Sequence, residues 1–232
     1  MTTMADLEKY KERYKLVYDE YVAQNIHSIL PEYVEGRRVL DIGANVGFVS
    51  LYFLAIGAKN TIAFEPNPPT FKLLQETAAG HDILPINAAV LNGLAKTVKM
   101  TSEENNNLGI AKSVPDSTGV EAWSLHQALS LFPEDDNNLV LKVDTEGSEY
   151  DIMLYASARD IRRAKTVFLE THQVPHLTPM AARHSDYLRD YMIFLGYTML
   201  NEQMVCWIEN GNYSQVPENK AMTFSRIDDW KG

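Results

Sequence analysis

The sequence predicts an α/β protein built on a doubly wound, mostly parallel β-sheet. Three observations carry this prediction. Short apolar strands alternate with helical segments from residue 38 to residue 89 through short links, as in parallel β-α-β units. The first strand, residues 39–42, breaks into a helix through a turn that holds Gly43 and Gly47. Two later apolar strands, residues 139–143 and 166–169, both end in acidic residues.

Residues 4–30 show the spacing of an amphipathic helix. Apolar and aromatic side chains recur in steps of three and four, and the next proline, Pro31, is expected to end the helix. This helix would pad the sheet, cover a pocket as a lid, or mediate dimerisation, and padding is the simplest of the three. We therefore expect residues 1–36 to form a helical extension of a single domain at residues 37–232.

The remaining elements follow in order. After the first helix, which ends near Gly57, we expect a strand at 61–64, a helix at 70–79 and a strand at 83–89. Residues 97–100 and 120–123 are expected to form an inserted hairpin around a polar loop at 105–107, with a short helix at 125–131. The predicted C-terminal elements are a helix at 180–195, strands at 197–200 and 205–208, a turn at 210–211 and an edge strand at 221–224.

Composition excludes several classes of protein. The formal net charge is −10, which disfavours a protein that grips nucleic-acid phosphates over a broad surface and suits a cationic small molecule. Cys206 is the only cysteine, so an intramolecular disulfide and a cysteine-rich zinc site are excluded. No apolar run reaches the roughly 18 residues that span a bilayer. We expect a cytoplasmic protein.

The glycine turn is built for a ligand without phosphates. Dinucleotide sites use G-x-G-x-x-G, whereas this chain has G-x-x-x-G, with Asn45 and Phe48 where the other glycines would fall. Asp41, just before the turn, would repel a pyrophosphate. We expect backbone N–H groups of the turn to face a crevice at the end of the sheet. S-adenosylmethionine has a cationic end and a carboxylate, and fits these features. The alternative is an ordinary strand-to-helix turn.

Two further positions suggest an adenosine ligand. Glu65 ends the second strand about 20 residues after the turn, where an acidic side chain accepts hydrogen bonds from ribose hydroxyls. Its alternative role is a charge at the N-terminus of the following helix. Asn87 and Ala88 end the third strand, where an adenine edge would lie in such a sheet.

Two sequence runs carry a resemblance to a known family. D-I-G-A-N-V-G at 41–47 and K-V-D-T-E-G-S-E at 142–149 resemble the FkbM-type S-adenosylmethionine-dependent methyltransferases, with F-E-P-N at 64–67 and N-A-A at 87–89 in the expected order between them. The resemblance covers roughly residues 38–172. One departure is His126, where the family usually has an acidic residue.

The resemblance implies a class I methyltransferase (Rossmann-like) fold with an antiparallel final strand. It also implies O-methylation of a hydroxyl on a sugar, polyketide or related small molecule. The cofactor-binding residues expected from the turn, the resemblance and the strand ends are Asp41, Gly43, Ala44, Asn45, Gly47, Glu65, Pro66, Asn87, Ala88 and Asp144.

The candidate catalytic groups follow two strands. Asp144 and Glu146 come after the strand at 139–143, and Glu170 and His172 after the strand at 166–169. If these strands are neighbours, the four side chains share one mouth, where Asp144 or His172 would remove the acceptor's proton. Alternatively, the carboxylates cap the next helix and His172 is a turn histidine. A Mg²⁺ ion held by these groups is a third arrangement, which we do not expect.

Other activities are compatible with the same residues. N-methylation needs less base and would leave Asp144 as a charge that binds an amine. A catalytically silent protein of this fold would only bind a ligand or a partner, and a homodimer is compatible with either. We favour the prediction of an enzyme that methylates a hydroxylated small-molecule acceptor. We expect neither a membrane nor a nucleic acid as its partner.

Overall fold

A seven-stranded sheet forms the centre of the computed structural model, which describes residues 2–102, 109–112, 119–172, 184–209 and 212–228. The strand order is β10-β11-β9-β8-β1-β2-β3. β11 is antiparallel to both its neighbours, and the other neighbouring pairs are parallel. This confirms the predicted doubly wound, mostly parallel sheet with an antiparallel final strand.

The strands of this main sheet are β1 (Arg38–Ile42), β2 (Asn60–Phe64), β3 (Ile83–Ile86), β8 (Leu139–Val143), β9 (Ala164–Thr171), β10 (Tyr197–Glu209) and β11 (Asn212–Arg226). A second sheet contains β4 (Ala88–Leu91), β7 (Val120–Ser124), β5 (Thr97–Ser102) and β6 (Gly109–Lys112), in that order. The helices are α1 (Met4–Glu8), α2 (Lys15–Tyr18), α3 (Pro31–Val34), α4 (Phe48–Ala55), α5 (Pro68–Ala78), α6 (Leu125–Leu129), α7 (Glu149–Tyr155), α8 (Ala158–Ile161) and α9 (His184–Phe194).

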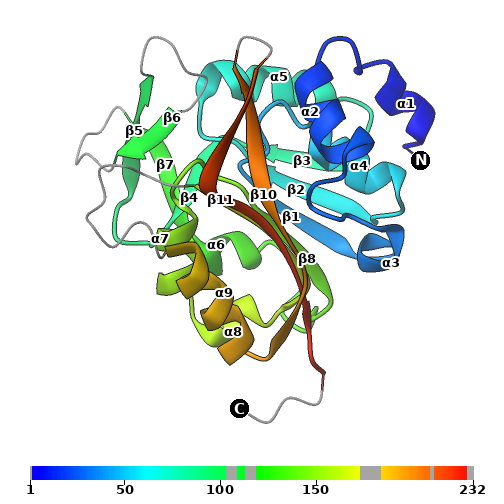
Figure 1. Ribbon diagram of the computed structural model, residues 1–232. Coiled ribbons are helices and arrows are strands. Elements are labelled where there is room, and N and C mark those ends of the chain that lie inside the picture. The colour runs from blue at the N-terminus through cyan, green and yellow to red at the C-terminus, as the bar shows by residue number, and fades with distance from the viewer. Residues whose placement is uncertain (1, 103–108, 113–118, 173–183, 210–211, 229–232) are drawn as a thin grey trace.

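Helices cover both faces of the main sheet, so its central strands are buried on both sides (Figure 1). Alternate residues of each strand enter different cores. Val39 and Val140 pack with α4, α5 and the N-terminal segment, whereas Leu40 and Leu141 pack with α6, α7, α8 and α9. This sandwich fixes the ends of β1, β8 and β9, where the candidate site lies.

The N-terminal segment differs from the continuous helix expected at residues 4–30. It forms α1, α2 and a five-residue π-helical turn (Asp19–Ala23), followed by a loop. Asn25 and Ser28 have φ angles of 47° and 48°, which a helix does not allow. Pro31 begins α3 instead of ending a helix, because proline suits the first helical position. Leu7, Tyr18 and Tyr21 still pack in one core with α4.

The inserted region is also more elaborate than expected. β5 and β7 pair antiparallel over two residue pairs, but β6, which we did not expect, pairs with β5 over four. The predicted loop at 105–107 lies outside the described residues. The strand expected at 83–89 divides at Asn87 into β3, in the main sheet, and β4, in the second sheet. A pattern of apolar residues over a few positions predicts a strand, but it does not show that the chain leaves one sheet for another at Asn87.

The C-terminal strands are longer than expected. The predicted strands at 197–200 and 205–208 are one strand, β10, with two register shifts along it. The strand expected at the edge, 221–224, is part of β11, which lies between β9 and β10, so β10 forms the edge. The turn predicted at 210–211 and the first residues of the helix predicted at 180–195 lie outside the described residues.

None of the helices in the described part of the chain is long and apolar enough to cross a membrane.

Candidate active site

The turn after β1 packs against the loop that follows β8. Gly43 has a φ angle of 80°, and a Cβ atom placed there would lie 1.7 Å from the backbone oxygen of Asp144. Only glycine therefore fits between the two strand ends. Unlike our expectation, the amides of the turn are already bonded: the N–H groups of Gly43 and Ala44 donate to Phe64 O (3.0 and 2.9 Å), and that of Gly47 to Ala44 O (2.8 Å).

Glu65 is held at the end of β2 by two backbone amides. The N–H of Asn45 donates to Glu65 Oε2 (3.0 Å), and the N–H of Asn67 donates to Oε1 (2.8 Å). A carboxylate has about four lone-pair sites, so each oxygen can still accept a further hydrogen bond. Burial raises the pKa of Glu65 to about 7, against the lowering effect of the two amides.

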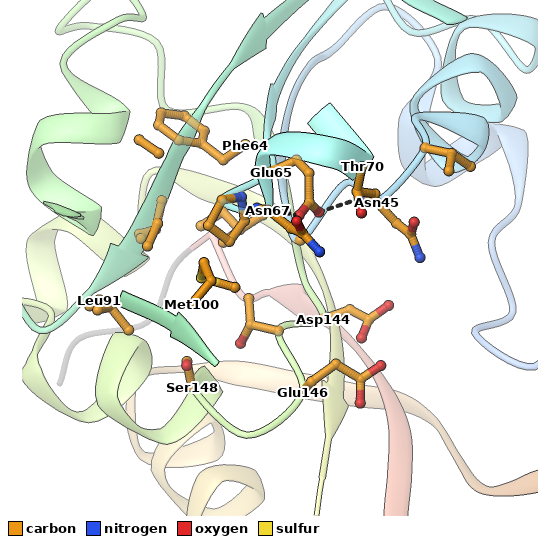
Figure 2. Close-up of a pocket in the computed structure, with 18 of the residues that line it drawn as sticks. Asn45, Phe64, Glu65, Asn67, Thr70, Leu91, Met100, Asp144, Glu146 and Ser148 are labelled. Atoms are coloured by element: carbon orange, nitrogen blue, oxygen red, sulfur yellow. Dashed lines mark hydrogen bonds between the residues drawn. The ribbon is translucent and has the colours of Figure 1, made fainter. Parts of the chain in front are cut away.

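A pocket of about 280 Å³ opens beside this carboxylate. Figure 2 shows Glu65 and Asn45 at one end of it and Glu146 and Ser148 at the other. Residues of several elements form its walls, and these residues are both apolar and polar. Phe64, Leu91 and Met100 are among the apolar ones. The expected cofactor-binding residues that line the pocket are Gly43, Asn45, Glu65, Pro66, Ala88 and Asp144.

Four expected cofactor-binding residues lie behind the pocket wall. Ala44 is buried in the core around α4. Gly47 packs against α5, since a Cβ atom there would lie 2.5 Å from Leu74 Cδ1. The Asn87 side chain donates to the carbonyl oxygens of Glu65 (2.8 Å) and Pro66 (3.1 Å), so it supports the Glu65 loop. Asp41, the fourth, is fully buried.

Asp41 belongs to a buried ion pair under the site. Its carboxylate accepts a hydrogen bond from Ser50 Oγ (2.6 Å) and lies 3.2 Å from Lys142 Nζ. Lys142 also donates to Gly43 O (2.8 Å) and lies 3.4 Å from Asp144 Oδ2. Burial lowers the pKa of Lys142, but the charges of Asp41 and Asp144 outweigh it and raise that pKa. Lys142 thus stays charged and ties the glycine turn to Asp144.

His172 lies at the centre of the predicted catalytic groups. Because β8 and β9 are parallel neighbours, their carboxyl ends meet, as expected. His172 Nε2 lies 3.3 Å from Glu146 Oε2, 3.3 Å from Glu170 Oε1 and 3.9 Å from Asp144 Oδ1. All four predicted catalytic side chains are therefore brought together. Asp144 and Glu146 line the pocket, whereas Glu170 and His172 are buried behind them.

The charge states of these groups follow from their crowding. Burial lowers the pKa of His172, but the carboxylates of Glu149, Glu170 and Glu146 outweigh it and raise that pKa well above its ordinary value. His172 is thus an imidazolium ion with no free lone pair. Burial, together with neighbouring carboxylates, raises the pKa of Glu146 to about 8 despite the opposing charge of His172.

Glu149 organises the loop between β8 and α7. Its Oε2 accepts hydrogen bonds from Thr145 Oγ1 (3.1 Å) and from the backbone N–H of Gly147 (2.9 Å). Its Oε1 accepts one from the backbone N–H of His172 (2.5 Å). Within this loop Glu146 has a φ angle of 55°, an unfavourable conformation for a non-glycine residue. The loop is therefore held in a strained form that presents Glu146 to the pocket.

Several site residues escaped the sequence analysis. Lys142 and Glu149 belong to the K-V-D-T-E-G-S-E run, and for Lys142 the available signal was a charged residue on an otherwise apolar strand. Three residues of the N-terminal segment also reach the site: Glu20, Tyr21 and His27. In the sequence, Tyr21 is simply one of the regularly spaced apolar and aromatic residues. Nothing in the sequence signals that long-range contact.

Among the residues that the structure describes, two groups of side chains offer the spacing of a metal site. Asp144, Glu170 and His172 each present one ligand atom, all within 4.8 Å of one another, and so do Glu20, His27 and Glu170. The charged His172 ring carries a proton on both nitrogens. One of the two nitrogens would have to lose its proton before it could bind a metal.

Comparison with known proteins identifies the class of this fold. TrmK of M. capricolum, in complex with S-adenosyl-homocysteine, is 10% identical, with 89% of this chain and 68% of that chain covered and a TM-score of 0.51. A Streptococcus pneumoniae protein assigned as a tRNA methyltransferase, in complex with S-adenosyl-L-methionine, is 12% identical, with 91% and 76% covered and a TM-score of 0.51. The fold is that of the class I, Rossmann-like methyltransferases.

The family is narrower than the fold. The methyltransferase FkbM domain matches residues 41–199, which is more than half of the chain, and the protein belongs to this family. It is a methyltransferase that uses S-adenosylmethionine as its methyl donor. No curated protein matches the sequence.

Proposed function

We propose that this methyltransferase transfers a methyl group to a hydroxyl oxygen of a small molecule, with Glu146 as the general base. The observation that carries the proposal is the placement of Glu146: this residue lines the pocket together with Asp144, and its Oε2 lies 3.3 Å from His172 Nε2. A hydroxyl, unlike a neutral amine, must lose its proton when it is methylated. A carboxyl with a pKa of about 8 is well matched to take it.

The residues of the pocket fit the donor. The free lone pairs of Glu65 can accept the two ribose hydroxyls, and Phe64, Leu91 and Met100 supply apolar surface for a purine. Asp144 is a carboxylate for the positive end of the molecule. When bound, S-adenosylmethionine supplies an electrophilic methyl group on a sulfonium. Gly43, Asn45, Pro66 and Ala88 are proposed to shape the rest of the site.

Asp144 and His172 are weaker candidates for the base, although we predicted them first. Asp144 already accepts a hydrogen bond from Tyr21, and its Oδ2 lies 3.4 Å from Lys142 Nζ, so two partners hold its carboxylate in place. His172 already carries its proton. We therefore propose that Asp144 binds the donor, while Glu170 and His172 set the charge and position of Glu146.

The acceptor class rests on charge. The net charge of −10 opposes broad contact with RNA. Low cysteine content fits a cytoplasmic enzyme. RNA methylation is the second candidate, because the fold is shared with the pneumococcal protein assigned as a tRNA methyltransferase.

The test is transfer of a carbon-13 methyl group from labelled S-adenosylmethionine to pooled hydroxylated metabolites, and separately to total RNA. The chemical shift of the new methyl signal tells whether the carbon is bonded to oxygen or to nitrogen. We expect an O-methyl signal in the metabolite pool, reduced roughly 100-fold or more in Glu146→Gln, since a positioned base contributes about 10²–10⁴. An N-methyl product, labelled RNA alone, or full activity in Glu146→Gln would contradict the proposal.

A further inference from the structure

The N-terminal segment reaches into the charged end of the site. Tyr21, in the π-helical turn, donates its hydroxyl to Asp144 Oδ2 at 3.0 Å across 123 positions of sequence. Tyr21 is 3% exposed, so water does not compete for this hydrogen bond. Tyr21 lies outside residues 41–199, the part of the chain that the family match covers.

The position of the Tyr21 ring is fixed by the ring of His27. It stacks on the ring of His27, with the centroids 4.7 Å apart and an interplanar angle of 13°. His27 Nε2 in turn lies 3.1 Å from Glu170 Oε2. The loop around His27 is anchored to β11 and β10, because Thr223 Oγ1 donates to His27 O (2.5 Å) and Asn201 Nδ2 donates to Ile26 O (3.2 Å).

These contacts leave little freedom to the Asp144 carboxylate. It is held by the Tyr21 hydroxyl from the N-terminal segment and by Lys142 from β8, while it lines the pocket. Burial and the charges of Asp144 and Glu20 raise the pKa of Tyr21 well above its ordinary value, so the hydroxyl keeps its proton and remains a donor. A carboxylate fixed in this way is preorganised for a cation.

We propose that Tyr21 is a positioning residue for the methyl donor: its hydroxyl holds Asp144 in the orientation that binds the positively charged end of S-adenosylmethionine. The N-terminal segment is thereby part of the donor site and more than padding for the sheet. This inference rests on the proposed role of Asp144.

The experiment compares two probes by calorimetry. S-adenosylmethionine carries the charged end, whereas 5′-methylthioadenosine has the same nucleoside with a neutral thioether in place of the sulfonium and has no charged group. Tyr21→Phe keeps the ring and its stacking and removes only the hydroxyl. We expect it to weaken S-adenosylmethionine binding roughly 5- to 30-fold, because hydrogen bonds to charged groups are strong. Binding of 5′-methylthioadenosine should change less than twofold.

Tyr18→Phe is the matched control. Tyr18 lies on the same segment, is 9% exposed and donates its hydroxyl to Glu8 Oε1 (2.8 Å), which is not among the groups around Asp144. It should leave the affinity for both probes unchanged. Equal weakening of both probes by Tyr21→Phe, or the same loss in Tyr18→Phe, would show a merely structural role and overturn the proposal.

A double-mutant cycle tests whether Tyr21 acts through Asp144. In Asp144→Asn the further change Tyr21→Phe should cost less than twofold in affinity, because the two effects share one contact. Additive losses would overturn the proposal, as would unchanged S-adenosylmethionine binding in Tyr21→Phe. Failure of the wild-type protein to bind S-adenosylmethionine would instead refute the donor site itself.

Discussion

At the scale of single residues, the site depends on close approach between strand ends. Gly43 leaves room for the backbone of Asp144, and Glu65 collects two amides that fix the neighbouring loops. Each of these features was visible in the sequence as a residue type at a spacing. What each residue touches was not visible, and Asp41 shows the difference: it is predicted at the ligand but pairs with Lys142 beneath it.

Gly43→Ala tests the close approach, with Gly80→Ala as its control. Both glycines have nearly the same φ, 80° and 82°, but a Cβ atom at Gly80 meets nothing within 4 Å. Gly80→Ala should cost about 1–2 kcal/mol from the left-handed backbone alone. Gly43→Ala should cost at least about 2 kcal/mol more, since a backbone oxygen must move. Denaturant unfolding measures both, and equal losses would refute the steric argument.

The ionisation of Glu65 should be visible in ligand binding. Its pKa of about 7 means that the carboxyl group gains a proton, and loses acceptor capacity, as the pH falls from 8 to 6. Affinity for 5′-methylthioadenosine, which does not itself titrate in this range, should therefore fall roughly tenfold over that interval. In Glu65→Gln the affinity should be low and flat with pH. A wild-type affinity independent of pH would contradict the assignment of Glu65 to the ribose.

At the scale of elements, the loop between β8 and α7 is the part of the molecule that carries the chemistry. Glu149 begins α7 and ties this loop to the end of β9. The alternative role considered for Asp144 and Glu146 was to cap α7, but in the structure Glu149 makes the hydrogen bonds that hold this loop. That leaves Asp144 and Glu146 facing the pocket.

Glu149→Gln should therefore loosen the loop as well as destabilise the protein. Glutamine replaces one of the two carboxylate oxygens by an amide nitrogen, which cannot accept a hydrogen bond from the backbone N–H of Gly147 or of His172. We therefore expect a loss of about 2–4 kcal/mol in unfolding free energy. Methyl transfer should fall at least roughly tenfold. Asp151→Asn, an exposed change in the same helical turn, removes the same helix-end charge and is the control. Equal effects of the two variants would mean that only the helix dipole matters.

The elements were predictable where a local pattern decided them. The strands β1, β2, β8 and β9 and the glycine turn were expected within one or two residues of their observed bounds. The N-terminal segment was not, because its helical spacing is broken at Asn25 and Ser28 by contacts with β10 and β11 that no local pattern records. For the same reason Tyr21 and His27 could not be assigned to the site.

At the scale of the whole molecule, the described residues place more carboxylates than cations around the site. Burial and its acidic neighbours Glu170 and Asp144 raise the pKa of Glu20 to about 9, and the crowding that raises the pKa of Glu146 is similar. His172 and Lys142 supply the countercharge from inside the protein. Because the charged His172 ring has no free lone pair for a metal and lies beside both Asp144 and Glu170, a chelator should leave methyl transfer unchanged. Loss of activity with a chelator, restored by Mg²⁺, would instead assign Asp144, Glu170 and His172 to a metal.

The most direct test of this account is a pair of calorimetric titrations of the wild-type protein and Glu65→Ala. We predict that S-adenosylmethionine binds the wild-type protein at one site, that Glu65→Ala weakens it at least roughly tenfold, and that a nicotinamide dinucleotide gives no binding heat. Tighter binding of the dinucleotide, or S-adenosylmethionine binding that Glu65→Ala leaves intact, would contradict the assignment of this pocket.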